Sequence, residues 1–412
     1  MAHSSTVTEL APPTALDCLK NDVDVQLARA RAYYDRLCYG KCYSITSNIL
    51  QDNPHHSDCL SLHVDVLVSL SKKNDLFLLA HKLVSNAPKA AFSWYAVGCY
   101  YYLIEKQDQA RHYFTKATNI DKLYGMAYLA FGHSFAVEGE HDQAMAAYCT
   151  AARLLKGSHL PYLYRGMEYL YTNHINVSLA RDNLMKAQEL RPDDPQTLHE
   201  LGVCYFREMI FNEAVQCFKK ALTAYAHQIG PVKDPEGRAA VEATLVCLGQ
   251  TYRKQGLYDQ ACDSFDQAIE LNADQHTTYA AKAFTRHLQG NVSEAIDLYH
   301  VALSLKAEDA FCEQMLTIAV KESVRGTEPD HRAENEDSLL VLDDSIQEKN
   351  QSSFISDLDN GDDLRVDDNS GFGFNNFRNL SESRDNGFGD GFGSGYEEGG
   401  VNEMSMSMDD SE

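Results

Sequence analysis

Basic residues and long apolar runs are both scarce in this sequence of 412 residues. Its 36 Lys and Arg face 60 Asp and Glu, and a formal net charge of −24 disfavours binding to nucleic acid or to an anionic membrane. Nowhere do 18 apolar residues run together, and the first ten residues, MAHSSTVTEL, have neither a basic nor an apolar stretch. We therefore expect a soluble, intracellular protein without a nucleic-acid or membrane partner.

Motifs that carry catalysis or bind phosphate are missing as well. Gly40-Lys41 is the nearest approach to a phosphate-binding loop, but no glycine stands five residues before Gly40. The sequence also has no Gly-x-Ser-x-Gly elbow, no paired-histidine metal helix and no kinase signature set. We expect no enzymatic activity and no cofactor, and we interpret the chain as a binding scaffold.

The eleven cysteines do not form a disulfide framework, because they are scattered and odd in number. Six lie in helical patterns beside apolar residues and are expected to be small core residues in a reducing compartment: Cys99, Cys149, Cys204, Cys217, Cys247 and Cys262. Cys38 and Cys42 share one helix face, with His55 and His56 downstream. A zinc site needs four converging ligands, so we expect no metal there.

A sequence repeat with a period of about 34 residues is the strongest positive signal. Small residues recur at Gly132, Ala144 and Ala151, and large residues stand between them at Tyr128, Phe131, Phe135 and Tyr148. The segment from Ala91 shows the same pattern one period earlier. Small residues let two helices approach, and large ones fill the seam between them. This pattern is typical of the tetratricopeptide (TPR) helix-turn-helix repeat, so the sequence predicts an all-α TPR solenoid.

About eight units follow from this register, starting near residues 23, 57, 91, 125, 159, 195, 242 and 276. The division is a loose arm at 1–22, the solenoid at 23–309, a capping helix at 310–325 and a tail at 326–412. The fifth unit has a turn two residues longer, around Thr172 to Asn176. After an extended second helix, Gly230, Pro231, Pro235 and Gly237 predict a loop between the sixth and seventh units.

The tail differs from the rest in composition. Residues 326–412 carry 23 acidic and 5 basic side chains, a net charge of −18, and two stretches, GFGFNNF and NGFGDGFGSGY, alternate Gly with Phe. Such a composition cannot bury enough apolar surface to offset its ordering entropy, so we expect disorder. Its Phe-Gly pairs indicate either a weakly sticky low-complexity segment or a docking motif.

First helices of stacked TPR units line a concave surface, which makes it the expected peptide groove. Its candidate lining in units six to eight is mostly apolar, with one cation: His199, Val203, Phe206, Val246, Gln250, Arg253, Ala280, Phe284 and His287. Phe206 and Phe284 are either ligand anchors or braces between repeats. The alternative site is the inner face of units three to five around Tyr95, Cys99, Leu129 and His133, which lacks the cationic clamp that chaperone adaptors use.

Four strings carry a resemblance to a known family: DRLCYGKCY from Asp35, SWYAVGCYYY from Ser93, GHSFAVEGEHDQAMAAY from Gly132 and KGSHLPYLYRGMEY from Lys156. Over roughly Asp35 to Leu305 the chain resembles the cell division cycle protein 16 type TPR subunit of the anaphase-promoting complex/cyclosome, a multisubunit ubiquitin ligase.

This resemblance implies a non-catalytic scaffold in the nucleus and cytoplasm that controls mitotic progression. It also implies partners among the complex's other subunits, including TPR subunits and a small accessory subunit. Homodimerisation is a further implication, although the family's N-terminal repeats are not in this sequence. The alternative is a free-standing TPR adaptor or co-chaperone that recruits other protein clients.

Overall fold

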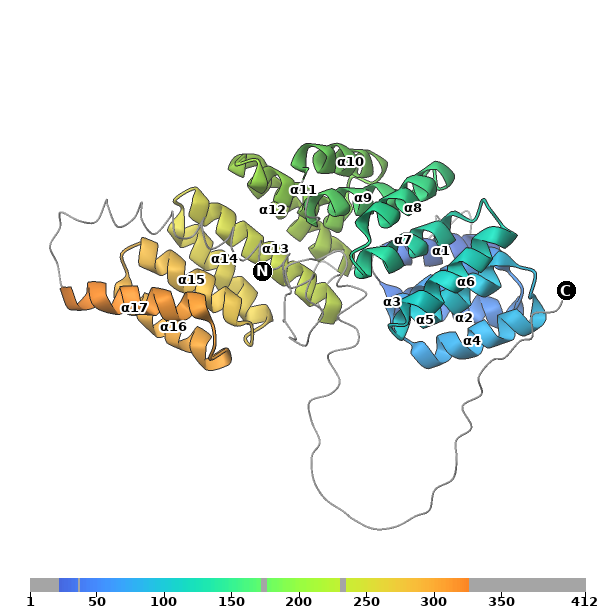
Figure 1. The fold of residues 1–412 in the computed structure, drawn as a ribbon, viewed down its shortest axis with the longest axis horizontal. Coiled ribbons are helices and arrows are strands. Elements are labelled where there is room, and N and C mark those ends of the chain that lie inside the picture. The colour runs from blue at the N-terminus through green and yellow to red at the C-terminus, as the bar shows by residue number, and fades with distance from the viewer. Residues whose placement is uncertain (1–21, 36–37, 172–175, 230–234, 326–412) are drawn as a thin grey trace, which may run out of the picture.

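The structure is a computed structural model that describes residues 22–35, 38–171, 176–229 and 235–325. These residues form helices and no strand, and the helices follow one another in antiparallel pairs along an arch (Figure 1). The all-α TPR solenoid is therefore confirmed. The expected acidic tail, and the expected arm apart from Asp22, lie outside the described residues, so the division into arm, solenoid, cap and tail stays a prediction.

The first helix of each pair lines the inner side of the arch, and the second lies on the outer side. The pairs are α1 (Val23–Asp35) with α2 (Tyr39–Asp52), α3 (Ser57–Ser69) with α4 (Lys73–Asn86), α5 (Ala91–Leu103) with α6 (Gln107–Ile120), α7 (Gly125–Val137) with α8 (His141–Leu154), α9 (Leu160–Tyr171) with α10 (Val177–Leu190), α11 (Pro195–Arg207) with α12 (Phe211–Ile229), α13 (Pro235–Lys254) with α14 (Tyr258–Leu271), and α15 (His276–Leu288) with α16 (Val292–Leu305). The last helix, α17 (Ala310–Arg325), packs on α15 and α16.

In the third to seventh pairs, close approach of the two helices depends on a glycine opposite one large side chain. A Cβ atom at Gly132 would lie 2.4 Å from the ring of Tyr148, which is buried on the second helix of the same pair. Gly98, Gly202 and Gly249 lie equally close to buried phenylalanine rings, each at the same sequence separation. In the fifth unit the partner of Gly166 is Leu184, which comes two positions later than this register predicts. The shift arises because five residues separate α9 from α10, whereas three separate α7 from α8.

The turn inside a pair requires a left-handed backbone conformation. Glycine meets this requirement in three units, with φ between 75° and 86° at Gly139, Gly256 and Gly290. Met209 takes the same conformation, with φ of 60°, although its side chain disfavours it. Three residues thus suffice to reverse the chain direction at each of these turns.

Neighbouring units are also joined by polar contacts between a second helix and the C-terminal part of the next first helix or the residue that caps it. Arg181 Nη1 donates to both carboxylate oxygens of Glu208, at 2.7 and 2.6 Å. Contacts with the same sequence spacing join Arg111 to Glu138 and His141 to Glu168. The register of the units is therefore fixed by polar contacts as well as by the apolar core.

The expected loop between the sixth and seventh units is partly wrong. Pro235 and Gly237 lie in α13, which begins at Pro235 and has 20 residues. Proline is well tolerated at the first position of a helix, because its missing N–H would have no partner there and its fixed φ is helical. The first helix of the seventh unit therefore extends toward the N-terminus beyond the expected unit start near residue 242, and Gly230 and Pro231 lie outside the described residues.

No disulfide bond joins the described cysteines. Cys99, Cys204, Cys217 and Cys262 are buried, as expected for core residues, whereas Cys149 and Cys247 are only half-buried. In the part of the chain that the structure describes, no group of acidic, His and Cys side chains could hold a metal ion, and no helix could cross a bilayer.

Candidate functional site

The inner side of the first five units encloses a small cavity of about 70 Å³. It is lined mostly by aromatic and apolar side chains: Tyr34, Asp65, Val68, Tyr95, Cys99, Tyr102, Phe114, Met126, Leu129, Ala130, His133, Leu160 and Tyr164. All four residues that the sequence named for this alternative site are among them. The lining has one carboxylate and no Lys or Arg, so it cannot form a cationic clamp for a peptide carboxylate.

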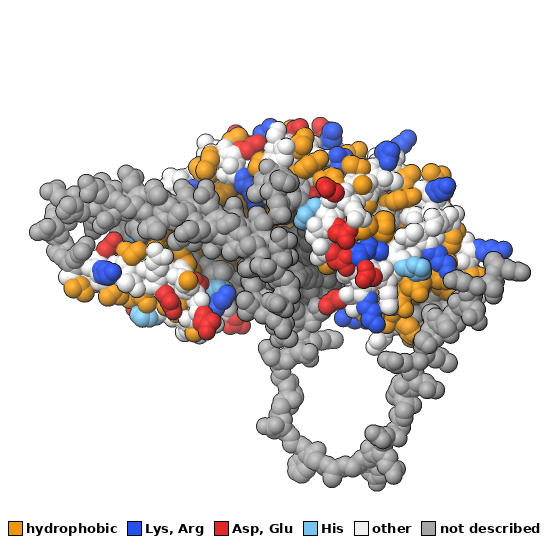
Figure 2. Space-filling model, in the orientation of Figure 1, with side chains coloured by type: hydrophobic (Ala, Val, Ile, Leu, Met, Phe, Trp, Pro, Cys, Tyr) orange, Lys and Arg blue, Asp and Glu red, His pale blue; other side chains and the backbone are white. Residues whose placement is uncertain are grey.

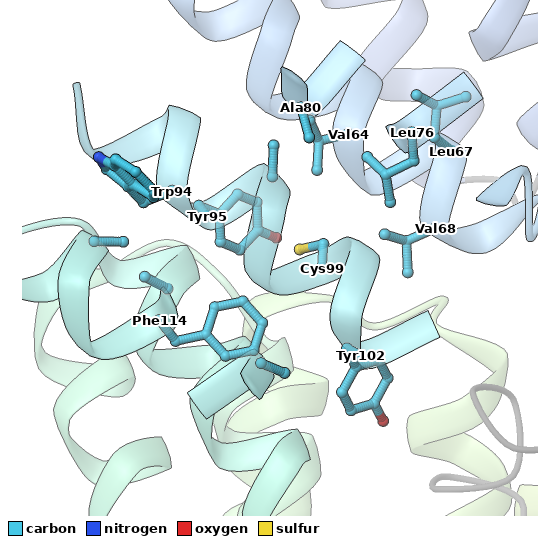
Figure 3. Close-up of a cluster of buried hydrophobic side chains, with 14 of the residues drawn as sticks. Val64, Leu67, Val68, Leu76, Ala80, Trp94, Tyr95, Cys99, Tyr102 and Phe114 are labelled. Atoms are coloured by element: carbon cyan, nitrogen blue, oxygen red, sulfur yellow. The ribbon is translucent and has the colours of Figure 1, made fainter. Parts of the chain in front are cut away.

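Asp65 and Tyr95 are the polar pair of this cavity. The Tyr95 hydroxyl donates to Asp65 Oδ1 at 2.7 Å. Burial raises the pKa of Asp65 to about 6, and the hydrogen bond from Tyr95 offsets only part of that shift. Figure 3 shows Tyr95 between Val64 of α3 and Phe114 of α6, with Cys99 beside it. The cavity is therefore an apolar space with one weakly acidic wall.

His133 is held as a neutral ring. Its Nδ1 lies 2.8 Å from the Tyr148 hydroxyl, and its ring packs edge-on against Tyr164 with centroids 4.3 Å apart. Burial lowers the pKa of His133 to about 3, so the ring is uncharged at neutral pH. His133 is therefore suited to packing and to hydrogen bonding at the cavity wall, and not to a charged contact with a ligand.

The candidate residues of units six to eight line up along α11, α13 and α15, and several of them join one first helix to the next. His199 Nδ1 lies 3.0 Å from Thr244 Oγ1. Thr244 Oγ1 also lies 2.8 Å from the Ala240 carbonyl oxygen, so this hydroxyl links the α13 backbone to His199 of α11. Burial lowers the pKa of His199 to about 4, so this histidine too is neutral.

Phe284 braces the end of the solenoid. Its side chain is only 1% exposed, with the Phe311 ring of α17 at a centroid distance of 5.7 Å. The Arg253 guanidinium lies 4.9 Å from the centre of the Phe284 ring, and His287 Nε2 lies 2.9 Å from Glu322 of α17. Of the two roles that the sequence left open for Phe284, the structure favours the brace.

Most of the remaining candidates are partly exposed to solvent. Phe206 is half-buried, with the Phe211 ring tilted against it at a centroid distance of 5.8 Å. Val203, Val246 and Gln250 are also half-buried, whereas Ala280 is buried. Phe206 is therefore the aromatic candidate of this stretch with area left to offer a ligand.

Sequence reasoning missed a buried carboxyl group in the middle of the inner face. Glu200 of α11 is fully buried, and its Oε2 accepts a hydrogen bond of 2.8 Å from the Tyr171 hydroxyl. Its Oε1 has no hydrogen-bond partner among the described residues. Burial raises the pKa of Glu200 from its ordinary 4.5 to about 7. Nothing in the local sequence marks this Glu, because charged residues of an amphipathic helix usually face water.

Glu200 gives the solenoid a pH-dependent stability. The pKa of Glu200 is higher in the folded state than in the unfolded state, so protonation of Glu200 stabilises the fold. This stabilisation is fully present below about pH 4.5 and is lost as the pH rises through 7. At about 1.4 kcal/mol per pKa unit, Glu200→Gln should be more stable than the parent by about 3 kcal/mol at pH 8. Urea unfolding at pH 5 and pH 8 measures this difference, which should shrink at the lower pH.

Glu270→Gln is the matched control, because Glu270 lies on α14 with an exposed side chain. Its stability should follow that of the parent at both pH values. If Glu200→Gln is no more stable than the parent at pH 8, then ionisation of Glu200 does not oppose folding.

Comparison with known proteins agrees with this architecture. A family model for the tetratricopeptide repeat matches residues 245–275, and a second one matches residues 93–123 and 278–309. The crystal structure of the anaphase-promoting complex hetero-tetramer Cut9–Hcn1 is similar, with a TM-score of 0.65 and 33% sequence identity. That match covers 74% of this chain and 57% of the solved chain.

Curated relatives point the same way. The chain is 39% identical over 337 residues to the cell division cycle protein 16 homolog of Mus musculus, a match that covers 82% of this chain and 53% of the relative. Anaphase-promoting complex subunit 6 of Arabidopsis thaliana is 40% identical over 302 residues, covering 73% and 54%. The chain thus spans about half the length of these relatives. It is therefore a tetratricopeptide-repeat protein, and its resemblance to the cell division cycle protein 16 family is confirmed.

Proposed function

We propose that this protein is a non-catalytic scaffold subunit of the anaphase-promoting complex, a ubiquitin ligase that controls mitotic progression. The observation that carries the proposal is the similarity to relatives named as subunits of that complex, at 39 to 40% identity over most of this chain. The partners would be other subunits of the complex, TPR subunits among them. Residence in the nucleus and cytoplasm, and assembly as a homodimer, are parts of the same proposal.

The inner face would hold a short segment of a small accessory subunit. In the similar solved structure, Cut9 is in a complex with Hcn1, and the match covers 74% of this chain. Neutral histidines, half-buried apolar residues and a small cavity suit an extended segment with apolar side chains. Asp65, which lines the cavity, would tolerate a hydrogen-bond donor from that segment better than a second carboxylate.

Phe206 is the aromatic side chain expected to contribute most to this binding. Phe206→Ala should weaken binding of the accessory subunit by about 2 kcal/mol, or roughly 30-fold in Kd, if the ring is a hot spot. Calorimetry on the purified proteins measures the change, and the parent should bind one accessory subunit per chain. An absence of binding by the parent would contradict an inner-face site for this partner.

Phe77→Ala on the outer helix α4 is the matched control, because its ring is 43% exposed and lies away from the inner face. This variant should bind the accessory subunit as tightly as the parent. If Phe206→Ala also binds as tightly, the contact lies elsewhere, and the cavity around Tyr95 and His133 becomes the site to test.

A further inference from the structure

A row of aromatic rings runs across α4, α5 and α6. The row runs from Phe77 of α4 through Tyr100 and Tyr101 of α5 to Tyr113 of α6, with successive ring centroids 5.2, 5.4 and 5.1 Å apart. These four residues are called the aromatic strip below. The strip joins α4 and α6, the second helices of successive units, through α5, so the four rings form one continuous row rather than isolated side chains.

The strip is accessible, and apolar surface continues beside it. Phe77 is 43% exposed and its neighbour Leu78 is 66% exposed, while the three tyrosines are only partly buried. Contiguous exposed apolar surface, unlike a single exposed apolar side chain, marks interaction sites on soluble proteins. The aromatic strip therefore has the character of a docking surface.

Histidine and lysine side chains lie beside the strip: His81 stacks on Phe77, His112 packs edge-on against Tyr113, and Lys116 lies over the adjoining Trp94 ring. Residues 72–123 carry eight Lys and Arg and four Asp and Glu, whereas residues 1–325 as a whole carry 31 basic and 37 acidic side chains. Lys82 of α4 and Lys116 of α6 are exposed, as are His81 and His112. Basic side chains occur among hydrophobic ones at the end of the body where α4 to α6 lie (Figure 2). An occupant should therefore be acidic and should bring aromatic side chains.

One segment of this same chain has that chemistry. Residues 385–398, DNGFGDGFGSGYEE, hold four acidic residues, no basic residue and an aromatic side chain at every fourth position. Glycines between Phe388, Phe392 and Tyr396 let the backbone approach a surface closely. The 59 residues between Arg325 and Asp385 span about 40 Å as a flexible coil and far more when extended.

We propose that residues 385–398 dock on the aromatic strip of the same chain. The aromatic side chains at 388, 392 and 396 pack against the exposed rings, and the four carboxylates lie among Lys82, Lys116 and the two histidines. Attraction between the net charge of +4 on residues 72–123 and the acidic segment favours the docked state, and added salt weakens it. The same acidic, aromatic chemistry on another protein could displace the segment.

Trp94 makes the proposal directly testable, because it is the only tryptophan of the chain and adjoins the strip. Its ring stacks on Tyr113 at a centroid distance of 5.9 Å with an interplanar angle of 3°, and Lys116 Nζ lies 3.5 Å from its centre. Because Trp94 is only 7% exposed, acrylamide quenches its fluorescence weakly, and a segment that covers the adjoining strip should lower this quenching further in the full-length chain.

The tail variant changes Phe388, Phe392 and Tyr396 to Ser, and its quenching constant should be about twice that of the parent. A control variant with Phe354, Phe372 and Phe374 changed to Ser keeps the same number of tail substitutions and should match the parent. Raising the salt to about 0.5 M should bring the parent toward the tail variant. Equal quenching constants in all three chains would overturn the proposal.

Phe77→Ser tests the other side of the contact, since an exposed ring is replaced without opening the core. This change should raise the quenching constant as the tail variant does, and combining the two should add nothing further. Additive effects would overturn the contact between the two sites. Quenching in the parent should not depend on protein concentration, and a dependence would assign the docking to a second copy instead.

Discussion

Phe284→Ala should lower the free energy of unfolding by about 3 to 5 kcal/mol. The ring is 1% exposed, contacts Phe311 of α17 edge-on and lies under the Arg253 guanidinium. Its removal leaves a cavity between α15 and α17, which close the C-terminal end of the described solenoid. Because each unit packs only on its neighbours, the loss should loosen α17 and the last pair first.

Urea unfolding followed by circular dichroism measures this loss, and hydrogen exchange locates it. Exchange should rise in α15 to α17 and stay near the parent level in α5 to α8. Phe206→Ala is the matched control, because the same substitution at a half-buried ring removes less buried area. A Phe284→Ala protein as stable as the Phe206→Ala protein would show that the ring does not brace the end.

Gly132→Leu should destabilise the solenoid by about 1 to 3 kcal/mol or more, through overpacking. A Cβ atom at Gly132 would lie 2.6 Å from Tyr148 Cδ1, and the Tyr148 ring is fully buried. The ring cannot move away without breaking its contact with His133, whose Nδ1 lies 2.8 Å from the Tyr148 hydroxyl. The added side chain must therefore push α7 and α8 apart.

Gly40→Leu in α2 is the control for this change, because a Cβ atom at Gly40 would meet nothing within 4 Å. Thermal unfolding of the two variants should show a lower midpoint for Gly132→Leu and no loss for Gly40→Leu. If Gly132→Leu melts at the parent's temperature, the seam between α7 and α8 does not require a glycine.

Local spacing explains why so much of the fold could be predicted from the sequence. A small residue and its large partner belong to the same helix pair, so Gly132 and Tyr148 reveal their contact without any long-range information. The two-residue shift of the fifth unit was visible in the same way. The start of α13 was not, because Pro235 can begin a helix as well as break one, and only tertiary packing decides between these roles.

Less of the candidate site could be predicted, because a repeat register assigns residues to helix positions but does not show which side chains of other helices cover them. It placed His199, Phe284 and His287 on first helices, but it could not show that Phe311 and Glu322 of α17 cover two of them. The buried Glu200 was also missed, because its partner Tyr171 belongs to another unit of the solenoid. Such contacts depend on how units stack.

Affinity purification of the tagged protein at its endogenous level, followed by mass spectrometry, tests the central claim most directly. A scaffold subunit of the anaphase-promoting complex should bring down a cullin-like subunit, a RING subunit and other TPR subunits in comparable amounts. Recovery of none of these, with unrelated clients in their place, would contradict the account and would favour a free-standing TPR adaptor.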